Sequence, residues 1–170
     1  FSFIAGALAA GFLSEVFRVY FVDGGKWKKH HLVDMVFKMA LMGGVSVMTD
    51  CFYRLQLIWF GSGTDWMTLH KKVIVDMFGY SIFVAGPVQC ILFSWKHAGF
   101  SWKLTYQHAF PLGRFLGNHF VPLSVSNICF WLPIVYVIYS MPPLLQMPLN
   151  LIAATIWGIL IVTVSNESRA

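Results

Sequence analysis

Charged residues are scarce in this chain. Among its 170 residues, Asp, Glu, Lys and Arg make up only 11%, whereas hydrophobic residues make up 58%. A soluble domain carries about 25% charged residues, so this chain has too little charge to cover a water-facing surface. A helix needs about 20 apolar residues to cross a membrane. We therefore expect an all-α fold, an integral membrane helix bundle of four to five spans.

Cysteine is also scarce, with three residues in three separate apolar segments: Cys51, Cys90 and Cys129. They form no CxxC motif and no zinc-ligand spacing with histidine, so we expect no metal site. The sequence contains no nucleophile elbow, P-loop or zinc-binding helix motif. We therefore expect no enzymatic activity and no cofactor other than structural lipids. No basic run is interleaved with aromatic residues in a soluble domain, which argues against nucleic-acid binding.

The apolar residues fall into five segments, which we interpret as the spans of a single transmembrane helical domain covering residues 1–170. Their approximate ranges are 1–22, 33–60, 73–95, 120–141 and 144–164. The Pro142-Pro143 pair separates the last two so closely that hydropathy allows either four or five complete spans. Gly86-Pro87 in the middle of the third segment predicts a kink there. Because the chain begins with Phe1 rather than Met, we expect a processed or incomplete N-terminus.

Basic residues gather at alternate ends of these segments, in the first loop and in the polar segment 96–117. We interpret both as membrane interfaces on the positive-inside side, where bases reach lipid headgroups. The headgroup residues are Lys26, Lys28, Lys29, Lys96, Trp102, Lys103 and Arg114. His30 and His31 adjoin the first loop. Neighbours in sequence point in different directions on a helix, so we expect a solvated loop rather than a metal site. In the second loop, Thr64 or Asp65 is expected to cap the next helix.

Three acid–base pairs lie inside apolar stretches of the first 54 residues, each with its members one helical turn apart. They are Glu15 with Arg18, Asp34 with Lys38, and Asp50 with Arg54. The acid precedes the base in each pair, which is the favourable order on a helix. Ionisable groups in a span are costly and mark candidate functional sites. Either the pairs neutralise their own charges within each helix, which we favour, or Asp50 and Arg54 line a polar path to which Tyr53 adds a hydroxyl.

Asp76 in the third segment differs from these acids. Its only base on the same helix is Lys72, one turn earlier, which is the less favourable order. Lys72 can also extend towards the membrane interface. We therefore expect Asp76 to take a partner from another helix, such as Arg54 or Lys38. An interhelical lock is the favoured interpretation, and an ion or proton gate is the alternative.

An ordered series of short motifs extends over most of the chain. It consists of Gly6, Gly11 and Glu15, then Asp34, Lys38 and Gly43, then Phe52-Tyr53-Arg54, Lys71-Lys72-Val73-Ile74-Val75-Asp76, Phe130-Trp131-Leu132-Pro133, Met141-Pro142 and Trp157. In order and spacing this series resembles the Mpv-17 and 22-kDa peroxisomal membrane protein family, small multi-span proteins of organelle membranes. The chain departs from the family pattern at Met77, where Gln is usual, and at Ser46-Val47, where Gly-Pro is usual. Of the polar residues usual near the C-terminus, Gln146 is the nearest candidate.

The resemblance implies a non-enzymatic protein of an organelle membrane that acts in membrane homeostasis. The departures near the C-terminus favour an accessory structural subunit of a large respiratory or photosynthetic membrane complex. The alternative is a weakly selective channel for ions or small metabolites, along Glu15, Asp50, Arg54 and Asp76. The expected partners are membrane lipids and other membrane subunits. The mitochondrial inner membrane is the expected location, with peroxisomal and plastid membranes as alternatives.

Overall fold

The computed structural model of the chain describes residues 1–109 and 121–167, with side chains described for 1–107 and 124–160. Its described residues are helical, with 88% helix and no strand among them, which confirms the all-α prediction. The chain divides into two compact units, Phe1–Ser62 with Ile138–Ala170, and Gly63–Val137.

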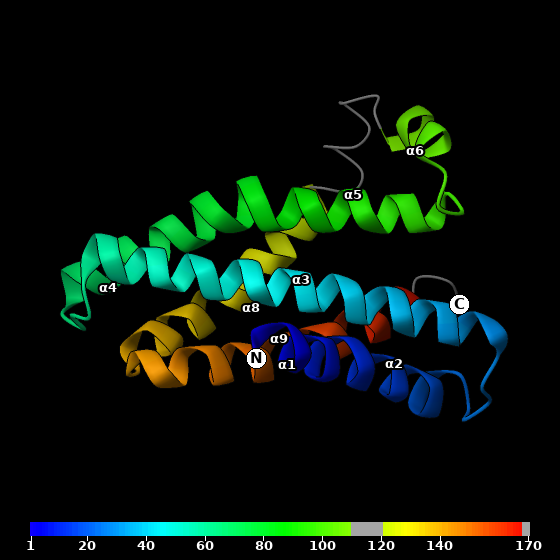
Figure 1. Ribbon diagram of the computed structural model, residues 1–170, viewed down its shortest axis with the longest axis horizontal. Coiled ribbons are helices and arrows are strands. Elements are labelled where there is room, and N and C mark those ends of the chain that lie inside the picture. Colours follow the sequence, from blue (N-terminus) through cyan, green and yellow to red (C-terminus); the bar gives the residue numbers. More distant parts are fainter. Residues whose placement is uncertain (110–120, 168–170) are drawn as a thin grey trace. The chain divides into compact units, whose positions relative to one another are not determined.

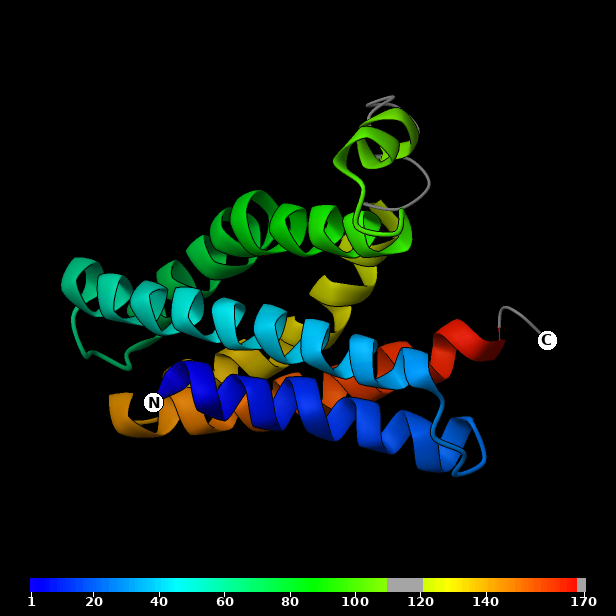
Figure 2. The same ribbon diagram turned by 45° about the vertical axis from the view of Figure 1, so that its right-hand side comes forward.

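The first unit holds three long helices. The first helix runs from Ser2 to Val22 and alternates between α-helical and wider π-helical turns, as α1 (Ser2–Gly6), η1 (Ala7–Phe12), α2 (Leu13–Phe17) and η2 (Arg18–Val22). The second is α3 (Lys29–Phe60), and the third is α9 (Pro143–Glu167). In both views the first helix and α3 run side by side, with α9 against the first helix (Figures 1 and 2).

Small residues let the first helix approach α3 closely. A Cβ atom added to Gly11 would lie 2.6 Å from the Cα of Met39, and one added to Gly6 would lie 2.8 Å from the carbonyl oxygen of Met42. Both contacts are with backbone, so they cannot be relieved by turning a side chain. Close approach of this kind is how helices gain packing energy in lipid. It also brings the polar side chains of the two helices within reach of each other.

The turn between the first helix and α3 fixes their antiparallel order. Gly24 and Gly25 have φ angles of 65° and 76°, in the left-handed region that glycine adopts without a steric penalty. The N–H of Gly25 donates to the carbonyl of Val19 at 2.8 Å, and that of Asp23 to Arg18 at 3.0 Å. These bonds satisfy carbonyls at the end of the first helix. They also hold Asp23 beside the start of α3.

The second unit is built on one long helix, Trp66–His97, made of α4 (Trp66–Ile74), η3 (Val75–Ala85) and α5 (Gly86–His97). Asp65 caps its start by accepting a hydrogen bond from the Thr68 N–H at 3.0 Å, so of the two residues expected for this role, Thr64 and Asp65, it is the second that serves. The π-helical turns of η3 end directly before Gly86-Pro87, where a kink was expected. Proline has no N–H to donate to the preceding turn of a helix. Helices that kink often do so at a proline or at a π-helical turn.

Two further helices follow among the residues that the structure describes here. They are α6 (Trp102–Ala109) and α8 (Val121–Ser140). The chain turns from α5 into α6 through Gly99 and Phe100, both with a φ of 63°. Trp95 stacks on Trp102 there, with ring centroids 5.0 Å apart. The predicted interfacial segment 96–117 thus contains the end of α5, the turn at residues 98–101 and all of α6, and residues 110–117 lie outside the described part of the chain.

Four helices in the described part of the chain are long and apolar enough to cross a membrane. They are Ser2–Val22, Lys29–Phe60, Trp66–His97 and Pro143–Leu160, and a shorter apolar helix covers Ser124–Ser140. These apolar helices indicate a membrane-associated protein. The shorter helix corresponds to the predicted segment 120–141, whose first residue lies outside the described range.

Candidate functional site: a buried charge cluster

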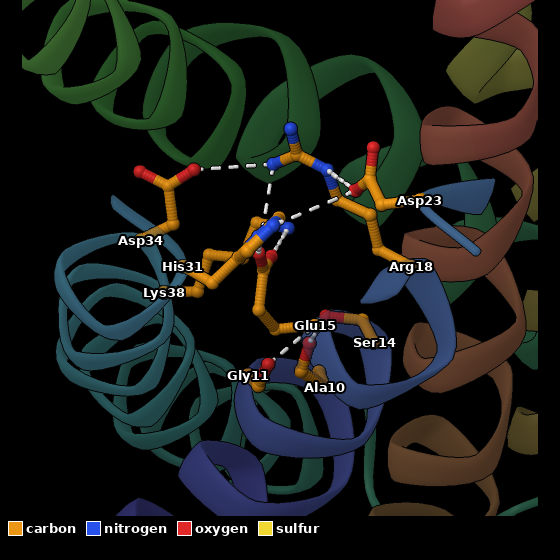
Figure 3. Close-up of polar contacts among 9 residues, drawn as sticks. All are labelled: Ala10, Gly11, Ser14, Glu15, Arg18, Asp23, His31, Asp34 and Lys38. Carbon is orange, nitrogen blue, oxygen red and sulfur yellow. Dashed lines mark hydrogen bonds and ion pairs between the residues drawn. The ribbon is translucent and has the colours of Figure 1, made fainter. Parts of the chain in front are cut away.

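Glu15 lies at the centre of a buried charge cluster between the first helix and α3 (Figure 3). Its side chain has no exposed surface, and it contacts three bases. Lys38 Nζ donates to Oε2 at 2.5 Å, His31 Nδ1 lies 3.2 Å from Oε1, and an Arg18 guanidinium nitrogen lies 3.6 Å from Oε1. Burying a carboxylate is costly unless opposite charge and hydrogen bonds replace its hydration. Here both oxygens have such partners.

Arg18 extends the cluster to two further carboxylates (Figure 3). It donates to Asp34 Oδ2 at 3.1 Å, and its Nε lies 3.4 Å from Asp23 Oδ2. The cluster therefore joins the first helix, the following turn and the start of α3. We call these six side chains the charge cluster: Glu15, Arg18, Asp23, His31, Asp34 and Lys38.

Helical spacing explains why these residues meet. His31, Asp34 and Lys38 follow one another at intervals of three and four residues, which places them along one face of α3. Glu15 and Arg18 are three residues apart on the first helix. Ser14 beside them donates to the carbonyls of Ala10 and Gly11 at 2.6 and 3.0 Å, so its hydroxyl is satisfied within its own helix. The antiparallel packing then brings the two polar faces together.

Further polar contacts join the helices of this unit nearer the C-terminal end of α3. The Tyr53 hydroxyl donates to Asn150 of α9 at 3.1 Å, and the Gln56 amide donates to the Tyr139 hydroxyl at 2.9 Å. All four of these side chains are buried. Ser2 at the start of the first helix donates to Asp50 at 3.0 Å. Polar contacts thus occur along most of the length of α3.

The sequence-predicted pairs divide into two kinds. Glu15 with Arg18, and Asp50 with Arg54 at 3.3 Å, are ion pairs within one helix. Asp34 and Lys38 instead have partners on the first helix, since Arg18 contacts Asp34 and Glu15 contacts Lys38. The expectation that charges are neutralised mostly within each helix is therefore incomplete. In the charge cluster the shortest contacts cross between helices.

Lys72 and Asp76 belong to the second unit. Lys72 Nζ lies 3.4 Å from the Gly63 carbonyl, and Asp76 accepts from the Ser81 hydroxyl at 3.4 Å. Both side chains are buried. The partners expected for Asp76, Arg54 and Lys38, belong to the first unit. An interhelical lock through Asp76 therefore stays a prediction, whereas Lys38 has its own carboxylate in Glu15.

The prediction of a solvated His30-His31 loop was wrong for His31. His31 is fully buried in the charge cluster, while His30 is exposed. The sequence carried a signal for this difference, because His31 lies seven residues before Lys38, about two turns along the same helix face. Asp23, Gln56, Tyr139 and Asn150 were also missed. The contacts of Gln56, Tyr139 and Asn150 depend on residues far away in the sequence, and those of Asp23 depend on the geometry of the turn.

The predicted headgroup residues are mostly exposed. Lys26, Lys28, Lys29 and Lys103 are exposed, Trp102 is 57% exposed, and Lys96 is half-buried. Arg114 lies outside the described residues. In the described part of the chain, no group of three or more His, Cys, Asp or Glu side chains is arranged to hold a metal ion.

Comparisons with protein-family models, with curated proteins and with solved structures found no match to this chain. The charge cluster must therefore be interpreted from its own chemistry. It holds six ionisable groups, it is largely closed to solvent, and it connects two apolar helices with the turn between them. Such a site can hold helices together, or it can bind and release a proton.

Proposed function

We propose that this chain is a non-enzymatic, multi-span protein of an organelle membrane. Its role is structural, either in membrane homeostasis or as an accessory subunit of a large respiratory or photosynthetic complex. The observation that carries this proposal is the contact of buried Glu15 with Lys38 and His31 of the neighbouring helix. An acid neutralised by fixed bases of the same unit holds helices together and leaves no charge available for a substrate.

The exposed surface of the described helices supports a role among lipids and other apolar helices. Large apolar side chains are exposed along the first helix, α3 and the long helix of the second unit, including Phe21, Ile58, Ile74 and Phe83. Water-soluble proteins rarely expose apolar residues so densely. In a membrane, lipid chains or neighbouring subunits cover such residues. Exposed Lys26, Lys28 and Lys29 beside the first helix suit anionic lipid headgroups.

The geometry is also compatible with the resemblance to the Mpv-17 and 22-kDa peroxisomal membrane protein family. Gly6 and Gly11 lie where the first helix packs most closely against α3, and Glu15 follows one turn later in the charge cluster. Tyr53 of the Phe52-Tyr53-Arg54 motif reaches α9 through Asn150. Four residues that carry the resemblance thus have structural roles, which is what a family of helix bundles would retain.

Native electrophoresis of mildly solubilised membranes tests the proposal. A tagged full-length chain, expressed in the organism that encodes it, is expected to migrate within an assembly much larger than its own 19.3 kDa. Fractionation should place it in an organelle membrane, with the mitochondrial inner membrane as the first expectation and peroxisomal and plastid membranes as alternatives. Migration as a monomer, with no change in membrane composition or in any respiratory or photosynthetic complex after deletion, would contradict both structural roles.

A weakly selective channel for ions or small metabolites is the second candidate, favoured by a polar stripe on the buried face of α3. Six buried side chains make up the stripe: His31, Lys38, Ser46, Thr49, Tyr53 and Gln56. Residues 31 and 56 are 25 apart, so the stripe extends over about 38 Å at 1.5 Å per residue. That exceeds the hydrocarbon thickness of about 30 Å.

Single-channel recording of the purified protein in planar bilayers separates the two candidates. A channel along the stripe should conduct, and Thr49→Val should change the conductance because it removes a hydroxyl without changing the side-chain shape much. The sequence-predicted path along Glu15, Asp50, Arg54 and Asp76 is tested in the same way by Asp76→Asn. No conductance from correctly folded protein would contradict the channel and favour the structural role.

A further inference from the structure

Both ring nitrogens of His31 face carboxylates. Nδ1 lies 3.2 Å from Oε1 of Glu15, and Nε2 lies 3.9 Å from Oδ2 of Asp23. The side chain of His31 is 1% exposed, so solvent has almost no access to it. Nε2 has no hydrogen-bond partner. Figure 3 shows the ring between the first helix and the turn that carries Asp23.

A neutral imidazole does not suit this position. It carries one N–H donor and one lone-pair acceptor, whereas an ionised carboxylate is only an acceptor. Whichever nitrogen carried the single proton, the lone pair of the other would point towards a carboxylate oxygen. An imidazolium has two N–H donors, so it directs one at Glu15 and the other at Asp23.

The sum of the charges in the cluster also favours a protonated His31. Its carboxylates are Glu15, Asp23 and Asp34, and its permanent cations are Arg18 and Lys38. Among these six side chains, a neutral His31 would leave three carboxylates beside two permanent cations, and burying an excess of one charge is costly. A proton on His31 brings the total to zero.

Among the described residues outside the charge cluster, the ionisable groups near His31 are exposed and do not supply a second positive charge inside the cluster. His30 lies against it with ring centroids 4.1 Å apart, but His30 is exposed and has water available. Lys28 and Lys29 precede it and are also exposed, and only the Lys28 carbonyl contacts the His31 backbone, at 3.0 Å. The side chains of α9 described as far as Leu160 include no acid or base.

We propose that His31 is a proton-binding site, and that its imidazolium ties the start of α3 both to the first helix and to the turn at residues 23–28. Loss of the proton removes the attraction to Asp23 and leaves the cluster negatively charged. The turn between the two helices is then held less tightly. The packing of the first helix on α3 thereby depends on whether His31 holds this proton. This inference holds whether the protein is a structural subunit or a channel.

Nitrogen NMR of the full-length protein, labelled with ¹⁵N-histidine in detergent micelles, tests the proposal. Both ring nitrogens of His31 should carry protons at pH 6. His30 is the internal reference for a solvent-exposed histidine of the same sequence region. The single-donor pattern of a neutral imidazole at His31 would overturn the proposal.

Two variants test whether Asp23 is the carboxylate that holds the proton on Nε2 of His31. Asp23→Asn removes one negative charge and keeps the side-chain shape, so the proton on Nε2 of His31 should lose its carboxylate partner and the ¹⁵N signal of Nε2 should shift. His30→Gln, the matched control on the exposed neighbour, should leave the His31 signals unchanged. An unchanged Nε2 signal of His31 in Asp23→Asn would overturn the tie to the turn. Neither variant changes a packed apolar side chain, and the NMR spectrum reports directly whether each has folded.

Discussion

Individual buried side chains hold the first unit together through opposite charge. Glu15 has no exposed surface, so its ionised form depends on Lys38, His31 and Arg18. Breaking a buried pair by removing one member is far more costly than replacing both members by neutral groups, because the remaining charge is left without compensation. The same reasoning applies less strongly to Asp50 and Arg54, since the Arg54 side chain is 76% exposed.

Lys38→Met should destabilise the protein by about 3 kcal/mol, since it removes the closest cation from buried Glu15. Unfolding in mixed micelles with increasing denaturing detergent measures the change. The matched control is Lys26→Met, the same substitution at an exposed loop position, which should change stability by less than about 0.5 kcal/mol. Adding Glu15→Gln to Lys38→Met should recover part of the lost stability, because it removes the carboxylate that Lys38 would have neutralised. No recovery in the double variant would show that packing of the lysine stem, rather than its charge, matters.

Asp65 should stabilise the start of the long helix of the second unit in a pH-dependent way. The Thr68 N–H that bonds its carboxylate holds the pKa of Asp65 below its ordinary value. The contribution of Asp65 to stability is therefore complete at a pH above the ordinary pKa of an aspartate. It is lost as the pH falls through the lower pKa that Asp65 has in the folded protein. Asp65→Ala should speed hydrogen exchange at the Thr68 amide at neutral pH, whereas Asp65→Ser, another good capping residue, should retain most of the protection. Equal exchange rates in all three proteins would contradict the cap.

Whole helices are positioned by the smallest side chains as well as by the charged ones. The first helix reaches α3 closely because Gly6 and Gly11 face its backbone. Without that approach, Lys38 could not reach Glu15. The packing of small residues and the charge cluster are therefore two parts of one helix interface, and a change in the first should weaken the second.

Gly11→Ala should destabilise the first unit by about 1 to 3 kcal/mol, because the added methyl group would overlap the backbone of Met39. The control is Gly44→Ala on α3, where an added Cβ has no neighbour within 4 Å. That substitution should be neutral or stabilising by up to about 1 kcal/mol, since alanine has the higher helix propensity. Detergent unfolding of both variants gives the comparison. Equal effects at the two positions would argue against close packing of the first helix on α3.

At the scale of the whole molecule, the apolar helices and the distribution of basic residues predict how the chain is threaded through a membrane. The exposed lysines at residues 26–29 follow the first helix, and Lys96 and Lys103 flank the turn after α5. The loop at residues 61–65, between α3 and α4, has one acid and no base. Positive loops stay on the side from which helices are inserted.

Single cysteines in sealed membrane vesicles test this topology, after replacement of the three native cysteines. His30→Cys and Ser101→Cys should react with a membrane-impermeant maleimide from the same side. Ser62→Cys should react only from the opposite side. Reaction of all three from one side would contradict a chain in which the first helix, α3 and Trp66–His97 each cross the membrane.

The sequence alone was enough to predict an all-α chain, the segments that form long apolar helices, and a cap at Thr64 or Asp65. These features depend on residues within one helix, where spacing determines which side chains share a face. The pairs Glu15–Arg18 and Asp50–Arg54 were accessible for the same reason, since each lies within one turn.

The partners of Glu15 across the interface, the burial of His31 and the contact of Tyr53 with Asn150 required the three-dimensional arrangement. The last of these joins residues 97 positions apart. A sequence pattern shows which face of a helix is polar, but not which other helix that face meets or in which register. That choice comes from close packing between helices, here at Gly6 and Gly11, and from the turn that places Asp23 beside His31.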